Sequence, residues 1–372
     1  MRFPEFSGKW KKVRLGEECN MLCGYAFNGE DIVEQGSYLL MRGINITEGS
    51  IRHSPELDRY YSGSIEKLDK YKLAVGDLVI GMDGSKVGRN SAIVSSYEDG
   101  SYLVQRVCRI KSSIGNNYIL QLINNTKFHQ YVDTVKTSSA IPHISLGDIQ
   151  NFRISIPPTQ DETDKIAKLF LLLDERIATQ NKIIERYESL IRGIAQHCIK
   201  ESTSGKTYVK LGDICQITTG KLDANAQVDN GIYPFFTCAE QPFKINSFAF
   251  DTEALLISGN GANLGYINYY KGKFNAYQRT YVLDLFSENI QYIKWALKVL
   301  LPKRIAIEKS SSNTPYIVLS TLTDLRLPIP CKSKQGFIAN LMQSLERKLS
   351  NQIAQYDSYN YLKQYLLRQM FI

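Results

Sequence analysis

An internal repeat constrains the fold of this chain more than any other feature of its sequence. Residues 13–19 return as residues 209–215, an offset of 196, and Gly24 matches Gly220 at the same offset. Three later matches have an offset of 173: Gln105-Arg106 with Gln278-Arg279, residues 141–146 with 314–319, and residues 154–157 with 327–330. The first copy therefore has 23 more residues in its early loops. Shared ends around different interiors predict one scaffold used twice, with a different specificity in each copy.

A seven-residue pattern follows each copy. Pro157-Pro158 prevents the first helix from starting earlier. After this pair, apolar residues recur at alternating steps of four and three residues. The same pattern occurs again 172 residues later. We expect Asp161 to cap the first helix. Each helix would contain ~36–40 residues, and two such helices in one chain pack most easily antiparallel. The expected seam positions are Ile166, Phe170, Leu173, Ile177, Gln180, Ile184, Ile338, Met342, Leu345, Leu349, Gln352 and Tyr356.

Gln180 and Gln352 occupy the same position in the two seams. If the two amides face each other in one layer, they fix the register of the helix pair, because a buried amide is costly unless a partner bonds to it. If they lie at the rim of the seam, water solvates them. The sequence leaves both roles open.

The globular copies read as mainly β, with a few helices. Short β-branched and aromatic runs such as Leu78–Ile80 and Tyr102–Ile110 are separated by Gly and Asn turns, and helices are expected at Tyr118–Phe128 and Ile290–Leu301. The predicted fold class is α+β: two similar domains, with a pseudo-two-fold repeat, joined by two long helices that form an antiparallel coiled coil. The expected boundaries are 1–157 and 202–330 for the domains, and 158–201 and 331–372 for the helices.

The composition argues against several classes of protein. No stretch approaches the ~20 apolar residues of a membrane span, and residues 1–6 lack the features of a signal peptide, so we expect a cytoplasmic protein. The seven cysteines are scattered and the four histidines have no metal-ligand spacing, so we expect free thiols and no metal site. The net charge of +8 suits a nucleic-acid partner without proving one.

Three segments carry a resemblance to a known family: residues 2–10 (RFPEFSGKW), residues 154–158 (ISIPP) and residues 362–371 (LKQYLLRQMF). They look like the start, the central region and the end of the specificity (S) subunits of type I restriction–modification systems. The order of variable domain, helix, variable domain, helix also resembles that family, and the likeness covers nearly the whole chain. It implies that residues 1–157 and 202–330 are target recognition domains, each reading one half of a split DNA sequence.

The resemblance also implies partners. The paired helices would set the spacing between the half-sites and dock two modification subunits, which are adenine-N6 methyltransferases that use S-adenosylmethionine. Two restriction subunits, with ATP-driven translocase and Mg²⁺-dependent nuclease activity, would complete the assembly on double-stranded DNA, with no membrane involved. This chain would hold no cofactor and no catalytic residue of its own.

The residues independently favour a non-catalytic chain. Asn313-Thr314-Pro315-Tyr316 differs from the methyltransferase motif because Thr replaces its first proline, and a structural turn is the simpler interpretation. Residues 259–265 have a G-x-G-x₃-G spacing that does not match a dinucleotide loop, and like residues 81–88 they read as turns between strands. Gly205-Lys206-Thr207 lacks the first glycine of a phosphate-binding loop and reads as a linker.

Candidate DNA contacts follow from the chemistry of base and phosphate recognition. For any one of them a solvated surface role competes with DNA contact. The two repeated Gln-Arg pairs attract attention because they place polar groups inside otherwise β-like runs, yet identity between copies that read different sequences favours a scaffold or phosphate role. The candidates are Arg42, Asn45, Lys86, Arg89, Gln105, Arg106, Lys136, Thr137 and Ser138 in the first copy, and Lys221, Asn260, Asn263, Gln278, Arg279, Lys309, Ser310, Ser311 and Asn313 in the second.

The sequence keeps other functions open beside a DNA-specificity subunit. A non-catalytic scaffold would use the coiled coil to join partners while the globular copies bind protein, and a subunit of a methylation-only system would work without restriction subunits. A basic face shared by both copies would favour DNA over the scaffold. A self-contained methyltransferase or nuclease is disfavoured because its motifs are missing.

Overall fold

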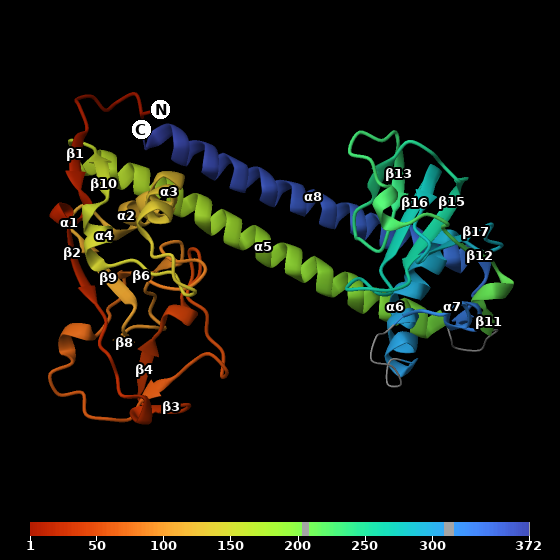
Figure 1. Ribbon diagram of the computed structural model, residues 1–372, viewed down its shortest axis with the longest axis horizontal. Helices are drawn as coiled ribbons and strands as arrows, with labels where there is room; N and C mark the ends of the chain where they lie inside the picture. Colours follow the sequence, from red (N-terminus) through yellow and green to blue (C-terminus); the bar gives the residue numbers. More distant parts are fainter. Residues whose placement is uncertain (203–207, 309–315, 372) are drawn as a thin grey trace. The chain divides into compact units, whose positions relative to one another are not determined.

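The computed structural model describes residues 1–202, 208–308 and 316–371 (Figure 1). The chain divides into two compact units: unit 1 contains Met1–Asn181 and Gln355–Ile372, and unit 2 contains Lys182–Ala354. Two long helices, α5 (Gln160–Ser202) and α8 (Lys332–Met370), each contribute one part to each unit. Among the helices of the described residues, none combines the length and the apolar character needed to cross a membrane.

The globular part of unit 1 contains two four-stranded sheets, in the orders β2-β9-β6-β7 and β3-β5-β4-β8, and a two-stranded ribbon of β1 and β10. Its strands and helices are β1 (Lys11–Arg14), α1 (Leu15–Glu18), β2 (Cys19–Cys23), β3 (Ile32–Val33), β4 (Tyr38–Met41), β5 (Tyr60–Tyr61), β6 (Leu78–Gly81), β7 (Ser91–Ile93), β8 (Tyr102–Leu103), β9 (Val107–Ser112), α2 (Asn116–Ile123), α3 (Thr126–Val135), α4 (Leu146–Asn151) and β10 (Arg153–Ile156).

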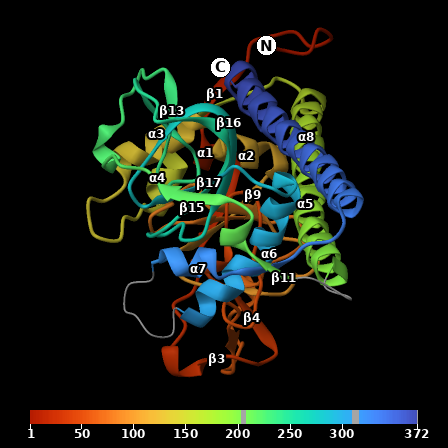
Figure 2. The ribbon, with the colours of Figure 1, turned by 90° about the vertical axis from the view of Figure 1, so that its right-hand side faces the viewer.

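The globular part of unit 2 contains one six-stranded sheet, in the order β12-β17-β15-β16-β13-β14, and a ribbon of β11 and β18. Helix α6 lies beside α5 in unit 2 (Figure 2), and its apolar residues form one buried cluster with residues of β15, β17 and α5. The elements are β11 (Tyr208–Lys210), β12 (Gln216–Thr219), β13 (Tyr233–Phe236), β14 (Phe243–Ile245), β15 (Phe250–Ser258), β16 (Ile267–Ala276), β17 (Thr280–Asp284), α6 (Ile290–Glu308), α7 (Leu319–Thr323) and β18 (Arg326–Pro328).

The ribbon explains why the ends of each copy are repeated in the sequence. In unit 1, Val13 pairs with Ile154 across β1 and β10, and in unit 2 Val209 pairs with Leu327 across β11 and β18. The start of each copy is therefore held against its end, immediately before the long helix begins. The repeated glycine after the ribbon is required by close packing, because a Cβ on Gly16 would lie 2.8 Å from the Cβ of Gln150.

Helices α5 and α8 run antiparallel in each unit, as the sequence predicts. In unit 1 the rings of Phe170 and Phe371 stack with centroids 5.7 Å apart, and further along α5 the Arg176 Nε lies 3.2 Å from the Tyr359 hydroxyl. In unit 2, the Lys334 Nζ donates to the Glu201 carbonyl at 3.3 Å. From one contact to the next, the residue number in α5 increases while the residue number in α8 decreases, so the two helices run antiparallel.

The heptad pattern reappears in the burial of each helix. Five of the expected seam positions are buried and the other seven are half-buried, while their flanking residues are mostly exposed. Gln180 is only 4% exposed and Gln352 is half-buried, so the polar position lies within the seam surface of each helix. Whether the two amides share one layer stays a prediction. The buried positions are Ile166, Phe170, Gln180, Ile338 and Met342; the half-buried ones are Leu173, Ile177, Ile184, Leu345, Leu349, Gln352 and Tyr356.

Two local expectations about helices are wrong. The single helix expected over Tyr118–Phe128 is two helices, because Asn125 caps α3: its Oδ1 accepts the Lys127 N–H at 2.9 Å. Asp161 does not cap α5 but lies inside its first turn, and the Thr159 hydroxyl accepts the Glu162 N–H at 3.4 Å instead.

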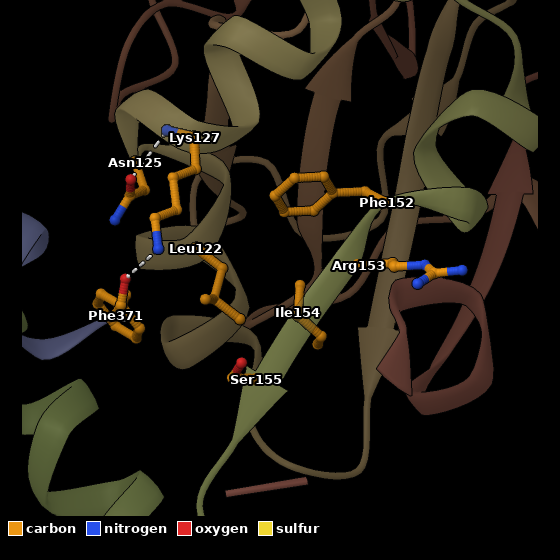
Figure 3. A pocket seen from close by; sticks show the side chains of 8 residues that line it. All are labelled: Leu122, Asn125, Lys127, Phe152, Arg153, Ile154, Ser155 and Phe371. Atoms are coloured by element: carbon orange, nitrogen blue, oxygen red, sulfur yellow. Dashed lines mark hydrogen bonds between the residues drawn. The ribbon is translucent and has the colours of Figure 1, made fainter. Parts of the chain in front are cut away.

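Asn125 and Lys127 also hold the end of α8 in unit 1. The Asn125 Nδ2 donates to the Leu367 carbonyl at 3.0 Å, and the Lys127 Nζ donates to the Phe371 carbonyl at 3.1 Å. Figure 3 shows Lys127 reaching from α3 to Phe371, with Phe152 and Ile154 on the far side of the same pocket. The last carbonyls of a helix need donors, and the cation also complements the helix dipole.

A carboxylate on each long helix binds the globular part of its own unit at matching places. In unit 1, the Gln121 Nε2 donates to Asp174 Oδ2 at 3.1 Å, and Lys363 of α8 pairs with the same carboxylate. In unit 2, Lys294 lies 2.8 Å from Glu346. Asp174 and Glu346 are 172 residues apart, so the repeat extends to the side chains that attach each domain to the helices.

Candidate nucleic-acid interface

In each unit, three repeated segments meet at one residue. In unit 1, the Met82 N–H donates to the Arg106 carbonyl at 2.9 Å, and the Met82 carbonyl accepts the Ile144 N–H at 3.0 Å. In unit 2, Gly259 makes the same two bonds, to the Arg279 carbonyl at 2.8 Å and from the Ile317 N–H at 2.9 Å. The glycine-rich turn, the Gln-Arg turn and the segment before the ribbon are therefore held together by the same backbone bonds in both units.

The repeated glycines Gly24 and Gly220 lie against the Gln-Arg turns. A Cβ on Gly24 would come within 2.1 Å of the Val104 carbonyl oxygen, and one on Gly220 within 1.9 Å of the Ala276 carbonyl oxygen. Real Cβ atoms do not approach a carbonyl this closely, so only glycine fits at either position. This contact explains why the glycine and the Gln-Arg pair recur together in the sequence.

The Gln-Arg pairs form turns rather than parts of strands. The run expected over Tyr102–Ile110 divides into β8 and β9 at Gln105-Arg106, where Arg106 has a φ of +67°, and Gln278-Arg279 joins β16 to β17. All four side chains are exposed. The strand expectation fails because a β-like composition continues through a tight two-residue turn that carries no glycine.

Arg106 and Arg279 present uncompensated positive charge. Across the described residues, no hydrogen bond or ion pair joins either guanidinium to another side chain, whereas the Gln278 Nε2 donates to Asp223 Oδ1 at 3.0 Å. An exposed guanidinium on a turn held by backbone bonds is suited to binding a phosphate, because no acidic side chain among the described residues already occupies it. The two turns share their backbone bonds, although φ is positive at Arg106 and not at Arg279, so each unit would offer one such phosphate contact.

Three of the four other cationic candidates of unit 1 already have acidic partners, whereas Arg42 donates to the Leu57 carbonyl at 3.3 Å. Lys86 lies 3.0 Å from Glu48, while Arg89 and Lys136 lie 2.9 Å and 2.6 Å from Asp133. The hydrogen bond from Lys136 is the main cause that lowers the pKa of Asp133. These cations could exchange their partners for phosphates, but each exchange would cost the existing ion pair.

The glycine-rich segments are turns between strands, as expected. Residues 81–88 lead from β6 towards β7, and residues 259–265 lead from β15 towards β16. In unit 2 the turn is bound to the loop after β13: the Cys238 Sγ donates to Asn260 Oδ1 at 3.0 Å, and the Asn263 Nδ2 donates to the Cys238 carbonyl at 3.0 Å. Both asparagines are half-buried, so part of each amide is already used to shape the loop.

One candidate is in a different environment from the exposed loop that we expected. Asn45 is 1% exposed, and its Nδ2 donates to Asp58 Oδ1 at 3.0 Å, so the structure gives it a packing role. The remaining candidates keep their DNA role as a prediction. Lys86, Ser138 and Lys221 are exposed; Arg42, Arg89, Lys136, Thr137, Asn260 and Asn263 are half-buried; Lys309, Ser310, Ser311 and Asn313 lie outside the described residues.

The contacts that hold residues 2–10 in place were not predicted from the sequence. Arg2 binds Glu162 through two contacts of 2.6 Å, and the Trp10 indole N–H donates to the same carboxylate at 3.3 Å. Glu162 is fully buried, and Arg2 is the cation that pairs with it. Both partners lie in the segment 2–10, but nothing in the sequence shows that a carboxylate 160 residues later is their target.

The described residues contain no cluster of three or more His, Cys, Asp or Glu side chains able to hold a metal ion. Both units contain a turn that carries an Arg without a side-chain partner among the described residues. In each unit this turn lies beside loops whose sequences differ between the copies. These are the features of a surface that binds a regular backbone in the same way twice while reading different bases.

Comparisons with known proteins agree with a protein that recognises DNA sequence. The family model described as the type I restriction modification DNA specificity domain matches residues 7–189 and again residues 203–356. The specificity subunit of the Escherichia coli type I restriction enzyme EcoDI is 44% identical over 137 residues, which is 37% of this chain and 30% of that protein. The specificity subunit of the E. coli enzyme EcoAI is 28% identical over 179 residues, which is 47% of this chain and 29% of that protein.

The fold is also that of a solved S subunit. The crystal structure of the S subunit of a type I restriction–modification system from M. genitalium matches with a TM-score of 0.68 at 17% identity, covering 100% of this chain and 99% of the other. The chain therefore belongs to the family of type I restriction–modification specificity subunits and contains two copies of its specificity domain. The matched segments span less than a third of each E. coli relative.

Proposed function

We propose that this chain is the DNA-sequence-specificity subunit of a type I restriction–modification complex. Each globular domain reads one half of a bipartite target in double-stranded DNA. The observation that carries this proposal is the matched turn: Arg106 and Arg279 occupy the same backbone position in the two units, exposed and unpaired among the described residues. In our proposal these arginines bind phosphates and the neighbouring loops, which differ between the copies, read the bases.

The long helices have a separate task in this proposal. They set the distance between the half-sites and dock two modification subunits, adenine-N6 methyltransferases that use S-adenosylmethionine. Two restriction subunits, which use ATP and Mg²⁺, bind the same assembly in the cytoplasm. This chain supplies recognition and no catalytic group. The paired faces of α5 and α8, with a repeated seam and matched carboxylates, support a scaffold built for two equivalent partners.

The test is co-expression of the chain with its modification subunit, followed by sequencing of methylated bases across the host DNA. We expect methylated adenines in one bipartite motif, with two short defined halves around a fixed gap. An assembled complex that methylates no motif would contradict the proposal and favour a protein scaffold. A methylated motif without any cleavage of unmodified DNA would identify a methylation-only system.

A domain exchange then assigns the halves. Replacing residues 1–157 with the corresponding domain of another S subunit should change one half of the motif and leave the other half and the gap unchanged. A change in both halves would show that the two domains do not read DNA independently. The reciprocal exchange of residues 202–330 is the matched control.

A further inference from the structure

Two cysteines face each other across neighbouring strands in unit 1. Cys23, the last residue of β2, is directly opposite Cys108 of β9. The Gly24 N–H donates to the Val107 carbonyl at 2.9 Å, which places the two cysteines at a non-hydrogen-bonded site of the ladder. Cα atoms at such a site are about 4.5 Å apart, inside the range of about 4.4–6.8 Å that a disulfide spans.

The two thiols have different environments. Cys108 is completely buried, whereas Cys23 is half-buried and next to the exposed Gln-Arg turn. The Cys23 Sγ donates to the Met82 Sδ at 3.7 Å and the Cys108 Sγ to the Arg109 carbonyl at 3.5 Å. The neighbouring Cys108 thiol is the main cause that lowers the pKa of Cys23 to about 7, and the charge of Arg106 lowers it further, against the opposing effect of burial. The pKa of Cys108 is raised by the neighbouring Cys23 thiol and by burial. Cys23 is therefore the more exposed of the two thiols and the one more readily deprotonated, and Cys108 lies directly opposite it.

We propose that Cys23 and Cys108 are a redox-active pair that closes to a cross-strand disulfide in the presence of hydrogen peroxide. The Cys23 thiolate attacks one peroxide oxygen, the O–O bond breaks, and hydroxide leaves and is protonated to water. The Cys108 sulfur then attacks the Cys23 sulfenic acid, the S–S bond forms, and the sulfenic hydroxyl leaves as water with the Cys108 proton. Two thiols lose two electrons, and one peroxide is reduced to two waters.

The pair belongs to the first copy alone. At the corresponding positions of the second copy, Thr219 faces Tyr281 across β12 and β17 in the same register. The modification site therefore lies in one of the two domains, beside Gly24 and under the turn that carries Arg106. It goes beyond the proposed function, because the chemistry needs neither DNA nor a partner subunit.

The test uses the reduced full-length chain, treated with a small excess of hydrogen peroxide and then alkylated with N-ethylmaleimide. Trypsin should release residues 15–42 joined to residues 107–109, as identified by mass spectrometry before and after reduction. Residues 15–42 also contain Cys19, which supplies a matched control: it is buried on the same strand, faces Ser112, and its pKa is raised to about 11 by burial.

We expect Cys19→Ser to leave the joined peptide intact and Cys23→Ser or Cys108→Ser to abolish it. The oxidation rate should rise several-fold between pH 6 and pH 8, because the attacking thiolate forms over that interval. A peroxide-treated chain in which Cys23 and Cys108 are both recovered alkylated would overturn the proposal, as would a joined peptide that survives Cys23→Ser. Far-ultraviolet circular dichroism of each variant verifies that it is folded.

Discussion

At the residue scale, the exposed guanidiniums of Arg106 and Arg279 are the groups whose role is most open to direct measurement. We expect Arg106→Gln and Arg279→Gln each to weaken binding to all DNA sequences alike, because a phosphate contact carries no sequence information. Each substitution should reduce the slope of log K against log salt concentration by about 1. Fluorescence anisotropy across a salt series measures both effects.

Lys67 provides the matched control for Arg106. It is also exposed, also positively charged, and has a φ of +68° in a different loop of unit 1. Lys67→Gln should change neither the affinity nor the salt slope. If Arg106→Gln instead relaxed the preference at one base pair, Arg106 would be reading a base, and the phosphate role would be wrong.

Gly24 and Gly220 allow a second test at this scale. Alanine at either position would put a Cβ about 2 Å from a carbonyl oxygen, so the turn must move. We expect a loss of about 1–3 kcal/mol in the stability of the domain concerned, as in other overpacked sites. Gly29→Ala is the control, because a Cβ there meets no atom within 4 Å. Calorimetric unfolding measures the stability of each variant. Equal losses of stability in Gly24→Ala and Gly29→Ala would mean that the close contact is unimportant.

At the element scale, sequence periodicity predicted the long helices better than it predicted the short elements. Both seams are recovered because a seven-residue period sustained over six positions in each helix is a strong signal that packing does not override. The helix over 118–128 and the strand over 102–110 each failed at a polar pair, Asn124-Asn125 and Gln105-Arg106, whose capping and turn geometry depends on distant backbone partners. The candidate DNA contacts stay predictions, and the sequence did not indicate that Asn45 is buried or that Lys86 and Arg89 already have acidic partners.

The carboxylates of α5 and α8 make a prediction about how each helix is attached. Asp174→Asn removes the charge that pairs with Lys363, whose side chain is 15% exposed, and should destabilise unit 1 by about 1–2 kcal/mol. Glu346→Gln removes the carboxylate that pairs with Lys294 and Lys298, and the Lys294 side chain is only 10% exposed. We expect this change to destabilise unit 2 by about 1–3 kcal/mol. Hydrogen exchange of each unit measures the effects, and each variant is the control for the other. Equal loss of protection in both units would contradict a local attachment.

At the scale of the whole molecule, the repeat separates what must stay constant from what can vary. The ribbon, the glycine under the turn, the turn itself and the helix carboxylates recur in both copies, while the loops between them differ in length by 23 residues. Recognition loops can therefore change without disturbing the helices that would bind partners. Under the proposed function, this separation predicts that partner assembly and DNA reading are independent of each other, which a single substitution in the seam can test.

Ile184→Asp is that substitution. Ile184 is a half-buried seam residue of α5, and a carboxylate there must either lose its water or push the helices apart. We expect the variant to lose its complex with the modification subunits in size-exclusion chromatography with light scattering, while both globular domains keep their calorimetric transitions. Ser189→Asp places the same charge on an exposed position of the same helix and should assemble normally. Normal assembly of Ile184→Asp would mean that the helix pair is not the docking element, and the partners would have to bind the globular domains.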